Sequence, residues 1–511
     1  MTKAETPMPA CTPASAPDGE VRLCNVSYTY PGAKQPALRD VSLQVPAGQC
    51  MVITGQSGCG KTTLTRLVNG LVPHVYDGDV KGTVHVGPTD VAQWTPDELG
   101  VRVGSVFQNP RSQFVNLDVA SEIAFGCENL GLPQPEIARR VQSAAATLGI
   151  GHLLTRSVEQ LSGGQKQAVI LASALAMYPD VFVMDEPTAS LDVESMQRLS
   201  HVVAALKASG KTVIVSEHRL WWLAGVADRV VLMENGTIAG DWTAAEYALL
   251  APDERARRGM RAWSVAEMEG PLPARPLSTA PSNAPANPLL QATALEVGYR
   301  KGQPILQGLD LALQPGTVTG LLGKNGAGKT TLMRCLAGLT RESDGAVALE
   351  GRPLPFRHRP GQVHLVMQEP GYQLFAGSAM AELEAAGTAD AAQALEDFQL
   401  TAVAQRHPLA LSGGQRQRLA IAAGIAQGAR VLVLDEPTSG LDRENMLRVA
   451  RALQQVAAKG AAIAVVTHDY EFLCAACSHV ALLSGGAITA RYPLDNAHAP
   501  LVREQLGFSP R

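Results

Sequence analysis

Two glycine-rich stretches of the chain carry a lysine and a threonine at the spacing of a phosphate-binding loop. Residues 55–62 read GQSGCGKT and residues 323–330 read GKNGAGKT. Glycines at these positions let the backbone curl until successive N–H groups face phosphate oxygens, and the helix that follows adds its positive N-terminal end. We therefore expect Lys61 and Lys329 to reach the β- and γ-phosphates of a nucleotide.

A pair of acidic residues follows a short apolar run in each half of the chain, within the sequences MDEPT and LDEPT. Asp185 and Asp435 end the apolar runs, where a carboxylate can hold a magnesium ion through water. Glu186 and Glu436 come next and are placed to orient or deprotonate an attacking water. The threonines of the glycine loops complete the expected metal site, which gives the ligands Thr62, Asp185, Thr330 and Asp435.

A third motif, LSGGQ, occurs at residues 161–165 and again at 411–415. A serine and two glycines before a helix make a second N-terminus that can bind an anion. Because each half already has one phosphate site, the second site is expected to serve a different nucleotide.

The three motifs recur in the same order, which indicates an internal duplication. Residues 270–288 between the copies are rich in Pro, Ala and Ser and read as a semi-extended linker. The predicted organisation is a disordered tail at 1–20, a first domain at 21–250, a linker at 251–290 and a second domain at 291–511.

Short apolar runs alternate with helical stretches in both halves. Such runs precede each glycine loop (50–54 and 318–322), each acidic pair (181–184 and 431–434), and Ser-Glu-His and Thr-His-Asp (213–215 and 464–466). This pattern predicts an α/β fold with a mainly parallel sheet covered by helices.

Composition excludes several classes of protein. The net charge of −4 gives no basic field of the kind that a nucleic-acid binder needs. The N-terminus has no apolar core region of a signal peptide, and no window approaches ~20 uncharged apolar residues, so we expect no direct insertion into a membrane. The eight cysteines are scattered and predict no disulfide framework.

Together these motifs resemble those of the ABC ATPases, in which LSGGQ is the signature motif. The resemblance covers nearly all of residues 21–250 and 291–490. It implies two P-loop domains, each with a mainly parallel core, an antiparallel β region and a helical subdomain. In that family each ATP lies between the P-loop of one domain and the signature of the other, which implies that the two domains pair within this chain.

The resemblance also implies roles for single residues. Gln108 and Gln368 match the Q-loop glutamine, which touches Mg²⁺, and His218 and His468 match the switch histidine near the γ-phosphate. Asp192 and Asp442 match the D-loop aspartate, and Tyr30 and Tyr299 match the aromatic residue that stacks on adenine, although a core tyrosine is the alternative. The expected ATP-binding residues are Tyr30, Gly55, Ser57, Gly58, Gly60, Lys61, Thr62, Thr63, Gln108, Ser162, Gly163, Gly164, Gln165, Tyr299, Gly323, Asn325, Gly326, Gly328, Lys329, Thr330, Thr331, Gln368, Ser412, Gly413, Gly414 and Gln415. Both halves carry the full set, so we expect two competent sites that use ATP and Mg²⁺.

The stretch FQNPRSQFVNLDVASEIAFGCENL at 107–130 resembles the ATPases of energy-coupling-factor (ECF) transporters. Gln113 and Gln373 recur five residues after the two Q-loop glutamines, and GLVPHVYDG at 70–78 looks like the fused double ATPases of that type. The resemblance implies a motor for import of a vitamin or a transition-metal ion. It would lie peripherally on the cytoplasmic face of the inner membrane, with a transmembrane coupling protein and a small membrane substrate-binding subunit.

Two other classes remain as alternatives. One is the ATPase of a sugar-type ABC importer, in which one catalytic site is usually altered. The other is a soluble ribosome-associated ABC-F ATPase, whose long charged helical linker contrasts with the six prolines between Pro271 and Pro288. The stretch from the Q-loop glutamine to the signature is ten positions shorter in the second half, which predicts unequal docking grooves or merely a shortened loop. Phe114, Phe125, Leu374 and Phe375 are the candidate docking residues.

Overall fold

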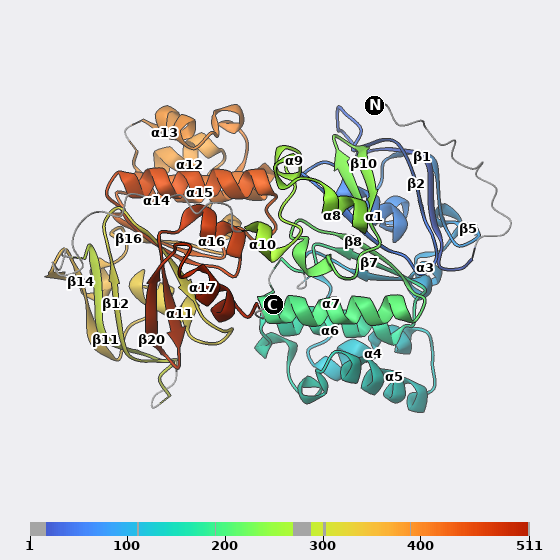
Figure 1. Cartoon of the computed structure of the whole chain (residues 1–511), viewed down its shortest axis with the longest axis horizontal. Helices are drawn as coiled ribbons and strands as arrows, with labels where there is room; N and C mark the ends of the chain where they lie inside the picture. Colours follow the sequence, from blue (N-terminus) through green and yellow to red (C-terminus); the bar gives the residue numbers. More distant parts are fainter. Residues whose placement is uncertain are drawn as a thin grey trace. The chain divides into compact units, whose positions relative to one another are not determined.

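The structure is a computed structural model that describes residues 17–109, 112–189, 191–268, 288–299, 303–388 and 390–508. Most of the predicted N-terminal tail and of the proline-rich linker lies outside these residues. The described residues form two compact units (Figure 1). The first unit contains the chain up to Leu191 together with Ser195–Trp263, and the second contains Asp192–Glu194 together with the chain from Ser264 onward.

The described part of the first unit contains two sheets. The larger has six strands in the order β10-β9-β3-β8-β7-β6, and all neighbours are parallel except β10 and β9. The smaller is antiparallel, in the order β2-β1-β4-β5. The strands are β1 (Val21–Thr29), β2 (Leu38–Val45), β3 (Cys50–Gly55), β4 (Asp79–Val86), β5 (Thr89–Asp90), β6 (Val103–Val106), β7 (Val181–Asp185), β8 (Thr212–Ser216), β9 (Arg229–Glu234) and β10 (Thr237–Thr243).

Helices cover this sheet and extend from it. The helices α4 and α5 pack on α6 and form a helical layer with its own hydrophobic cluster (Figure 1). The helices of the unit are α1 (Lys61–Val68), α2 (Leu71–His74), α3 (Pro96–Arg102), α4 (Val119–Asn129), α5 (Gln134–Thr147), α6 (Gly163–Ala176), α7 (Val193–Ala208), α8 (Ala244–Leu249) and α9 (Pro252–Arg257).

The second unit repeats this architecture. Its larger sheet runs β16-β17-β18-β13-β19-β20, with only the last pair antiparallel among the described strands, and its smaller sheet runs β12-β11-β14-β15. The strands are β11 (Leu290–Val297), β12 (Leu306–Leu313), β13 (Val318–Leu322), β14 (Asp344–Leu349), β15 (Arg352–Pro353), β16 (Val363–Val366), β17 (Val431–Asp435), β18 (Ala462–Val466), β19 (His479–Ser484) and β20 (Ala487–Pro493). The helices are α10 (Val265–Met268), α11 (Lys329–Leu336), α12 (Ala379–Ala385), α13 (Ala391–Asp397), α14 (Gly413–Ala426), α15 (Arg443–Ala458), α16 (Tyr470–Ala476) and α17 (Ala499–Leu506).

The predicted fold class is confirmed, and each predicted apolar run lies on a strand of the larger sheets. These strands are β3, β7 and β8 in the first unit and β13, β17 and β18 in the second. Every residue of β3, β7 and β8 is buried, as expected for parallel strands with both faces covered. The glycine loops, acidic pairs and histidines therefore all follow the carboxyl ends of neighbouring strands, where ligands bind in open α/β sheets.

The first unit extends beyond the boundary at residue 250 that the sequence predicted. Trp263 and Arg255 are buried, although they fall in the predicted linker. The Trp263 ring lies 5.0 Å from the Tyr247 ring, and Arg255 donates hydrogen bonds to the carbonyl oxygens of Tyr247 and Leu250. This segment has too many buried contacts to act as a free linker.

The ten-residue difference between the halves falls in the helical layer. In the second unit α12 and α13 have seven residues each, where α4 and α5 have 11 and 14. The alternative of a shortened surface loop is therefore wrong, because the helices themselves are shorter.

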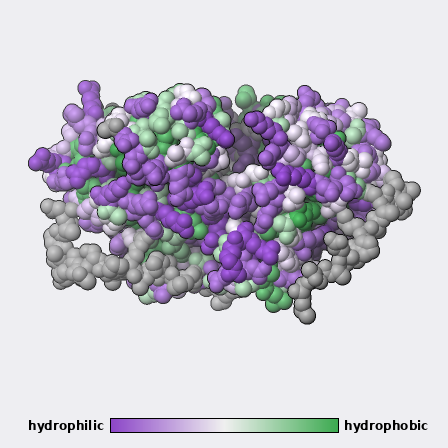
Figure 2. Space-filling model, turned by 90° about the horizontal axis from the view of Figure 1, so that it is seen from above, coloured by the Kyte–Doolittle hydropathy of each residue, from purple (hydrophilic) through white to green (hydrophobic). Residues whose placement is uncertain are grey.

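Within the described part of the chain, six cysteines are free and buried. Cys24 is disulfide-bonded. Among the described residues, none of the helices has the length and apolar character that crossing a membrane requires. The face drawn in Figure 2 is mostly hydrophilic, with hydrophobic residues in small groups.

Candidate functional site

The lysine of each glycine loop is buried and held by its own loop. Lys61 Nζ donates hydrogen bonds to the carbonyl oxygens of Gly55 and Gln56, at 2.9 and 3.1 Å. Lys329 makes the corresponding pair of bonds at 2.6 and 3.0 Å. The loop curls tightly because Gly55 has φ 144°, and a β-carbon there would lie only 2.2 Å from a backbone oxygen of β9.

The aspartate at the end of β7 has the character of a metal ligand. Burial raises the pKa of Asp185, the charge of Glu186 adds to this rise, and the Thr62 hydroxyl opposes it. Asp185 Oδ1 has no hydrogen-bond partner among the described residues. A buried carboxylate oxygen without a donor, next to a threonine hydroxyl, fits a hard divalent cation such as Mg²⁺.

The second unit places the same residue types together. Thr330 Oγ1 donates a hydrogen bond to Asp435 Oδ2 at 2.9 Å. Burial raises the pKa of Asp435, while the Thr330 bond and the Lys329 charge oppose that rise. Burial lowers the pKa of Lys329, although the carboxylates of Glu436 and Asp435 pull it upward.

The two glutamates that follow these aspartates share an uncommon backbone conformation. Glu186 and Glu436 both have φ 46°, in the left-handed region, which costs a residue with a β-carbon about 1–2 kcal/mol. Their N–H groups donate to the carbonyl oxygens of Ser216 and Val466, at 2.8 and 2.9 Å. The neighbouring strand thus fixes the same strained turn in both units, as is common at functional sites.

In the first unit Glu186 lies between the two side chains that the resemblance assigned to the site. Gln108 Nε2 donates to Glu186 Oε2 at 2.6 Å, and His218 Nε2 lies 3.3 Å from Oε1 without the alignment of a hydrogen bond. Burial alone would raise the pKa of Glu186, but His218, Lys61 and Gln108 outweigh it and the pKa falls below its ordinary value. The carboxylate is therefore charged at neutral pH, the form that a general base needs.

In the second unit the histidine and the glutamate lie farther apart. His468 Nε2 lies 3.8 Å from Glu436 Oε1, and the His468 N–H donates to Glu436 Oε2 at 3.4 Å. The roles of these residues stay predictions, but their proximity in both units is what those roles require.

A carboxylate beside the histidine was missed by the sequence analysis. In the first unit Thr188 Oγ1 donates a short hydrogen bond to Glu217, whose other oxygen accepts from the His218 N–H at 2.7 Å. Arg219 donates in turn to the Thr188 carbonyl oxygen. Glu217 is only 3% exposed, so this buried network connects the DEPT loop to the loop that carries the histidine.

The second unit makes the same connection from the other side of the histidine. Thr438 Oγ1 donates to Asp469 Oδ2 at 3.2 Å. The first unit reads Ser-Glu-His-Arg and the second Thr-His-Asp, so the acidic residue moves from one side of the histidine to the other. This exchange of position was the signal in the sequence that pointed to the acidic residue beside each histidine.

The signature serines cap the long helices α6 and α14. Ser162 Oγ accepts from the Gln165 N–H, and Gln165 Oε1 accepts from the Ser162 N–H at 3.0 Å, which forms a capping box. Ser412 and Gln415 repeat it. Each signature thus opens a helix of the helical layer, with its serine and first glycine exposed, and does not belong to the sheet that carries the glycine loop.

The two candidate adenine-stacking tyrosines are anchored alike. The Tyr30 hydroxyl lies 3.1 Å from Thr63 Oγ1, and the Tyr299 hydroxyl lies 3.4 Å from Thr331 Oγ1. Tyr299 is 59% exposed, whereas Tyr30 is half-buried and packs edge-on against Tyr28 at 4.7 Å. Tyr299 therefore has the more open ring for stacking.

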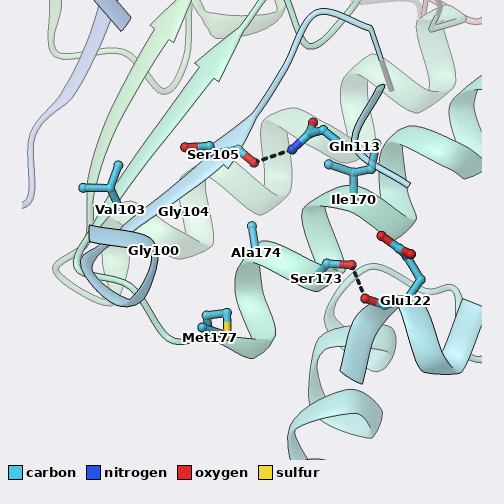
Figure 3. Close-up of a pocket in the computed structure, with 10 residues that line it drawn as sticks. All are labelled: Gly100, Val103, Gly104, Ser105, Gln113, Glu122, Ile170, Ser173, Ala174 and Met177. Atoms are coloured by element: carbon cyan, nitrogen blue, oxygen red, sulfur yellow. Dashed lines mark hydrogen bonds between the residues drawn. The ribbon is translucent and has the colours of Figure 1, made fainter. Parts of the chain in front are cut away.

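The recurrent glutamines Gln113 and Gln373 close the loops that follow the Q-loop glutamines. Gln113 Oε1 accepts from the Phe107 N–H at 2.7 Å, and its Nε2 donates to the Ser105 carbonyl oxygen at 3.0 Å (Figure 3). Gln373 bonds in the same way to Met367 and Leu365. These bonds fasten a loop to the end of the edge strand β6 or β16.

A glutamate anchors the far end of each loop, and the one in the first unit, Glu122, is buried. Glu122 on α4 accepts from the N–H groups of Val115 and Asn116, at 3.0 and 2.7 Å, and Glu382 on α12 repeats this pair of bonds. The sequence analysis gave neither glutamate a role. Both hold the post-Q-loop segment against the helical layer.

The four candidate docking residues differ in exposure. Phe375 is 82% exposed and Leu374 is 4% exposed. Phe114 and Phe125 are half-buried, and Phe114 packs against the core of the helical layer. Phe375 therefore suits a docking role, while Leu374 is a core residue.

Comparison with known proteins agrees with this geometry. A family model described as ABC transporter matches residues 38–189 and 306–439, one region in each unit. A provisionally named ABC transporter ATP-binding protein of Treponema denticola is 40% identical over 92% of this chain and 96% of its own length. A provisionally named HMP/thiamine import ATP-binding protein of Bacillus subtilis is 31% identical over 94% of this chain and 92% of its own length.

Among solved structures, cbiO1 from Clostridium perfringens, described as part of the ABC transporter complex cbiONQ, is 28% identical. The match covers 47% of this chain and 94% of the cbiO1 chain, with a TM-score of 0.41. The family model alone covers more than half of the chain. The chain therefore belongs to the ABC transporter family, as a fused tandem ATP-binding protein whose ATPase activity is coupled to transport.

Proposed function

We propose that the chain is the energy-coupling ATPase of an ECF-type importer and powers uptake of a vitamin or a transition-metal ion through separate transmembrane subunits. The observation that carries the proposal is the post-Q-loop stretch at 107–130, which resembles the ATPases of that type. The bonds of Gln113 and Glu122 support it, because they give this stretch a defined shape beside the Q-loop glutamine. The name of the Bacillus subtilis relative supports a thiamine precursor among the candidate substrates.

The chemistry follows from the residues that the strands bring together. Lys61 and Lys329 exchange their loop carbonyl contacts for phosphate oxygens when ATP binds. Glu186 and Glu436 then accept a proton from the attacking water, and His218 and His468 lie beside them, where they can contact the γ-phosphate. The lowered pKa of Glu186 keeps it in the acceptor form.

Magnesium would be held by Thr62, Asp185 and Gln108 in the first unit and by Thr330, Asp435 and Gln368 in the second. When bound, the ion offsets the negative charge of the phosphates. The unpartnered Asp185 oxygen supports this assignment.

We further propose that the nucleotides are sandwiched between the two domains of one chain. The exposed signature serines Ser162 and Ser412, each at the positive end of a 14-residue helix, suit a phosphate from the other domain. The chain would lie peripherally at the cytoplasmic face of the inner membrane, bound to a coupling protein and a small substrate-binding subunit.

Purification of the tagged chain from detergent-solubilised membranes tests the importer class. The expected result is a complex with a membrane-spanning coupling protein and a small membrane protein, whose reconstitution in vesicles gives ATP-dependent uptake of a vitamin or a metal ion. Recovery of ribosomes would instead indicate an ABC-F ATPase, and recovery of a sugar permease pair would indicate the other importer type. Either result would refute the ECF assignment.

A further inference from the structure

A buried arginine on the signature helix of the second unit has no counterpart in the first. Arg418 lies on α14, six residues after the signature serine, and is buried. At the same distance from its own signature serine the first unit has Ala168. Both signature helices have 14 residues and the same capping box, so the helix forms equally well without the arginine. Because burying a charge is costly, the presence of Arg418 calls for a reason other than folding.

Arg418 connects the helical layer to the helix that follows the second acidic pair. Its Nε donates to the Phe398 carbonyl oxygen at 3.0 Å, at the C-terminal end of α13, and its Nη1 donates to Asn445 Oδ1 on α15 at 3.4 Å. Burial lowers the pKa of Arg418 to about 10, which leaves the guanidinium charged at neutral pH. The helices α13, α14 and α15 lie together in the second unit (Figure 1), and this one side chain contacts the ends of two of them.

Asn445 extends the connection to the aspartate that matches the D-loop. Asp442 caps α15, because its Oδ1 accepts from the Asn445 N–H at 2.7 Å. Its Oδ2 accepts from Asn445 Nδ2 at 3.0 Å. One residue thus bonds to both oxygens of the carboxylate, and this fixes the rotation of the carboxylate group.

The signature itself packs against the same asparagine. A β-carbon on Gly414, the second glycine of the signature, would lie 2.8 Å from Asn445 Oδ1, so a side chain larger than glycine would push the two helices apart. Three parts of the second unit therefore meet at Asn445: the signature, the D-loop aspartate and, through Arg418, the helical layer. A displacement of any one of them is transmitted to the other two.

The first unit has different chemistry at both positions. Ser195 occupies the place of Asn445, and its hydroxyl would lie 3.2 Å from a β-carbon on Gly164. That hydroxyl accepts a hydrogen bond from Arg198 at 3.1 Å. Ala168, which occupies the place of Arg418, has no group that could donate a hydrogen bond. The connection from the helical layer through an arginine is therefore specific to the second unit.

We propose that Arg418 and Asn445 are positioning residues for one of the two ATP sites, and that they hold the Asp442 carboxylate in register with the signature of the second unit. This rests on the proposed sandwich of the nucleotides, in which that signature completes the site that contains Glu186. The serine of the signature and the aspartate then reach this nucleotide together. The site that contains Glu436 is completed by a signature without the arginine, so the two sites are unequal even though their catalytic residue types are the same.

Turnover measured with one site silenced tests the proposal. Glu436→Gln leaves Glu186 as the catalytic glutamate, and Glu186→Gln leaves Glu436. The pair Arg418→Ala and Asn445→Ser gives the second unit the residue types of the first. In the Glu436→Gln chain this pair should lower the remaining kcat about tenfold, and in the Glu186→Gln chain by less than about twofold. The KM for ATP should change less than about threefold in both, because neither residue reaches a predicted phosphate contact.

A second variant guards against a loss of the fold. Asn445→Asp keeps the size of the side chain and the acceptor for Arg418, but it places a carboxylate oxygen against Asp442 where the amide donor was. It should therefore give the same selective loss of kcat with a melting temperature close to that of the unsubstituted chain. Arg451→Ala, which removes an exposed arginine from the same helix, is the matched control and should change neither rate.

The outcomes separate this proposal from the one on which it rests. A similar loss in both silenced chains, or no loss in either, by folded Asn445→Asp overturns the proposal. A loss confined to the Glu186→Gln chain also overturns it, because the two residues would then act on the site of their own domain. The sandwich is tested without these substitutions, by the ATP-driven compaction of the doubly silenced chain. If that compaction does not occur, the sandwich fails whatever Arg418 and Asn445 do.

Discussion

The carboxylate that lies before the histidine in one unit and after it in the other gives a direct test of how the switch loop is held. Glu217→Thr removes the acceptor of the Thr188 bond, and Arg219→Asp places a second carboxylate beside Glu217. The double variant gives the first unit the sequence Thr-His-Asp, which the second unit already uses to bond Thr438 to Asp469 at 3.2 Å. Each single variant should impair turnover, and the double variant should restore it.

The expected decrease in kcat follows from the hydrogen bonds that the substitutions remove. A hydrogen bond to a charged group contributes about 1.5–3 kcal/mol, and Glu217 accepts from Thr188 and from two backbone N–H groups. If one such bond holds His218 beside Glu186 in the transition state, its loss lowers kcat about 10- to 100-fold. The KM for ATP should change less than about threefold, because Glu217 lies behind the histidine and reaches no predicted phosphate contact.

Steady-state ATPase assays on the full chain, with melting temperatures measured on the same samples, decide the matter. The expected result is a low kcat for Glu217→Thr and for Arg219→Asp, and a kcat within about threefold of the unsubstituted chain for the double variant. If both single variants keep normal turnover, or if the double variant is as poor as the product of the two, the carboxylate does not position the histidine.

Three further predictions concern catalysis, pairing and docking. Glu186→Gln and Glu436→Gln should each lower turnover about tenfold or more while ATP binding, measured by fluorescence titration, is kept, and a near-normal rate in either would show that its site is not catalytic. The doubly substituted chain should stay monomeric in light scattering with ATP yet become more compact, because a tether gives an effective concentration of roughly millimolar; ATP-dependent dimers at micromolar protein would instead indicate pairing between chains. Phe375→Asp should reduce recovery of the membrane partner with little change in melting temperature. Leu374→Asp should instead lower the melting temperature by several degrees, because this substitution buries an unpaired charge. Equal destabilisation by both substitutions would assign Phe375 to the core.

Local sequence was sufficient wherever the chemistry depends on consecutive residues. The curl around Lys61 needs only the glycines of its own loop, and the acidic pair Asp185 and Glu186 follows directly from the apolar run that forms β7. Apolar runs of three to five residues predicted the buried parallel strands, because both faces of such strands are covered. For this reason the sequence was sufficient to predict the fold class, which was confirmed. It was also sufficient to predict the types of the catalytic residues, whose roles remain predictions.

The tertiary structure decided what depends on pairs far apart in the chain. The bond from Thr188 to Glu217 joins the loops that follow β7 and β8, which are neighbours only in the sheet. The burial of Trp263 against Tyr247 places the end of the first unit beyond the predicted boundary. Leu374 and Phe375 are adjacent and both apolar, yet one is buried and the other exposed. The first unit has a pocket where Gly104 on β6 faces Ala174 on α6, whereas in the second unit the His364 ring on β16 lies against Gly424 on α14. Sequence alone gives the chemistry that each residue can perform, whereas close packing between distant segments determines which surfaces remain open to a partner.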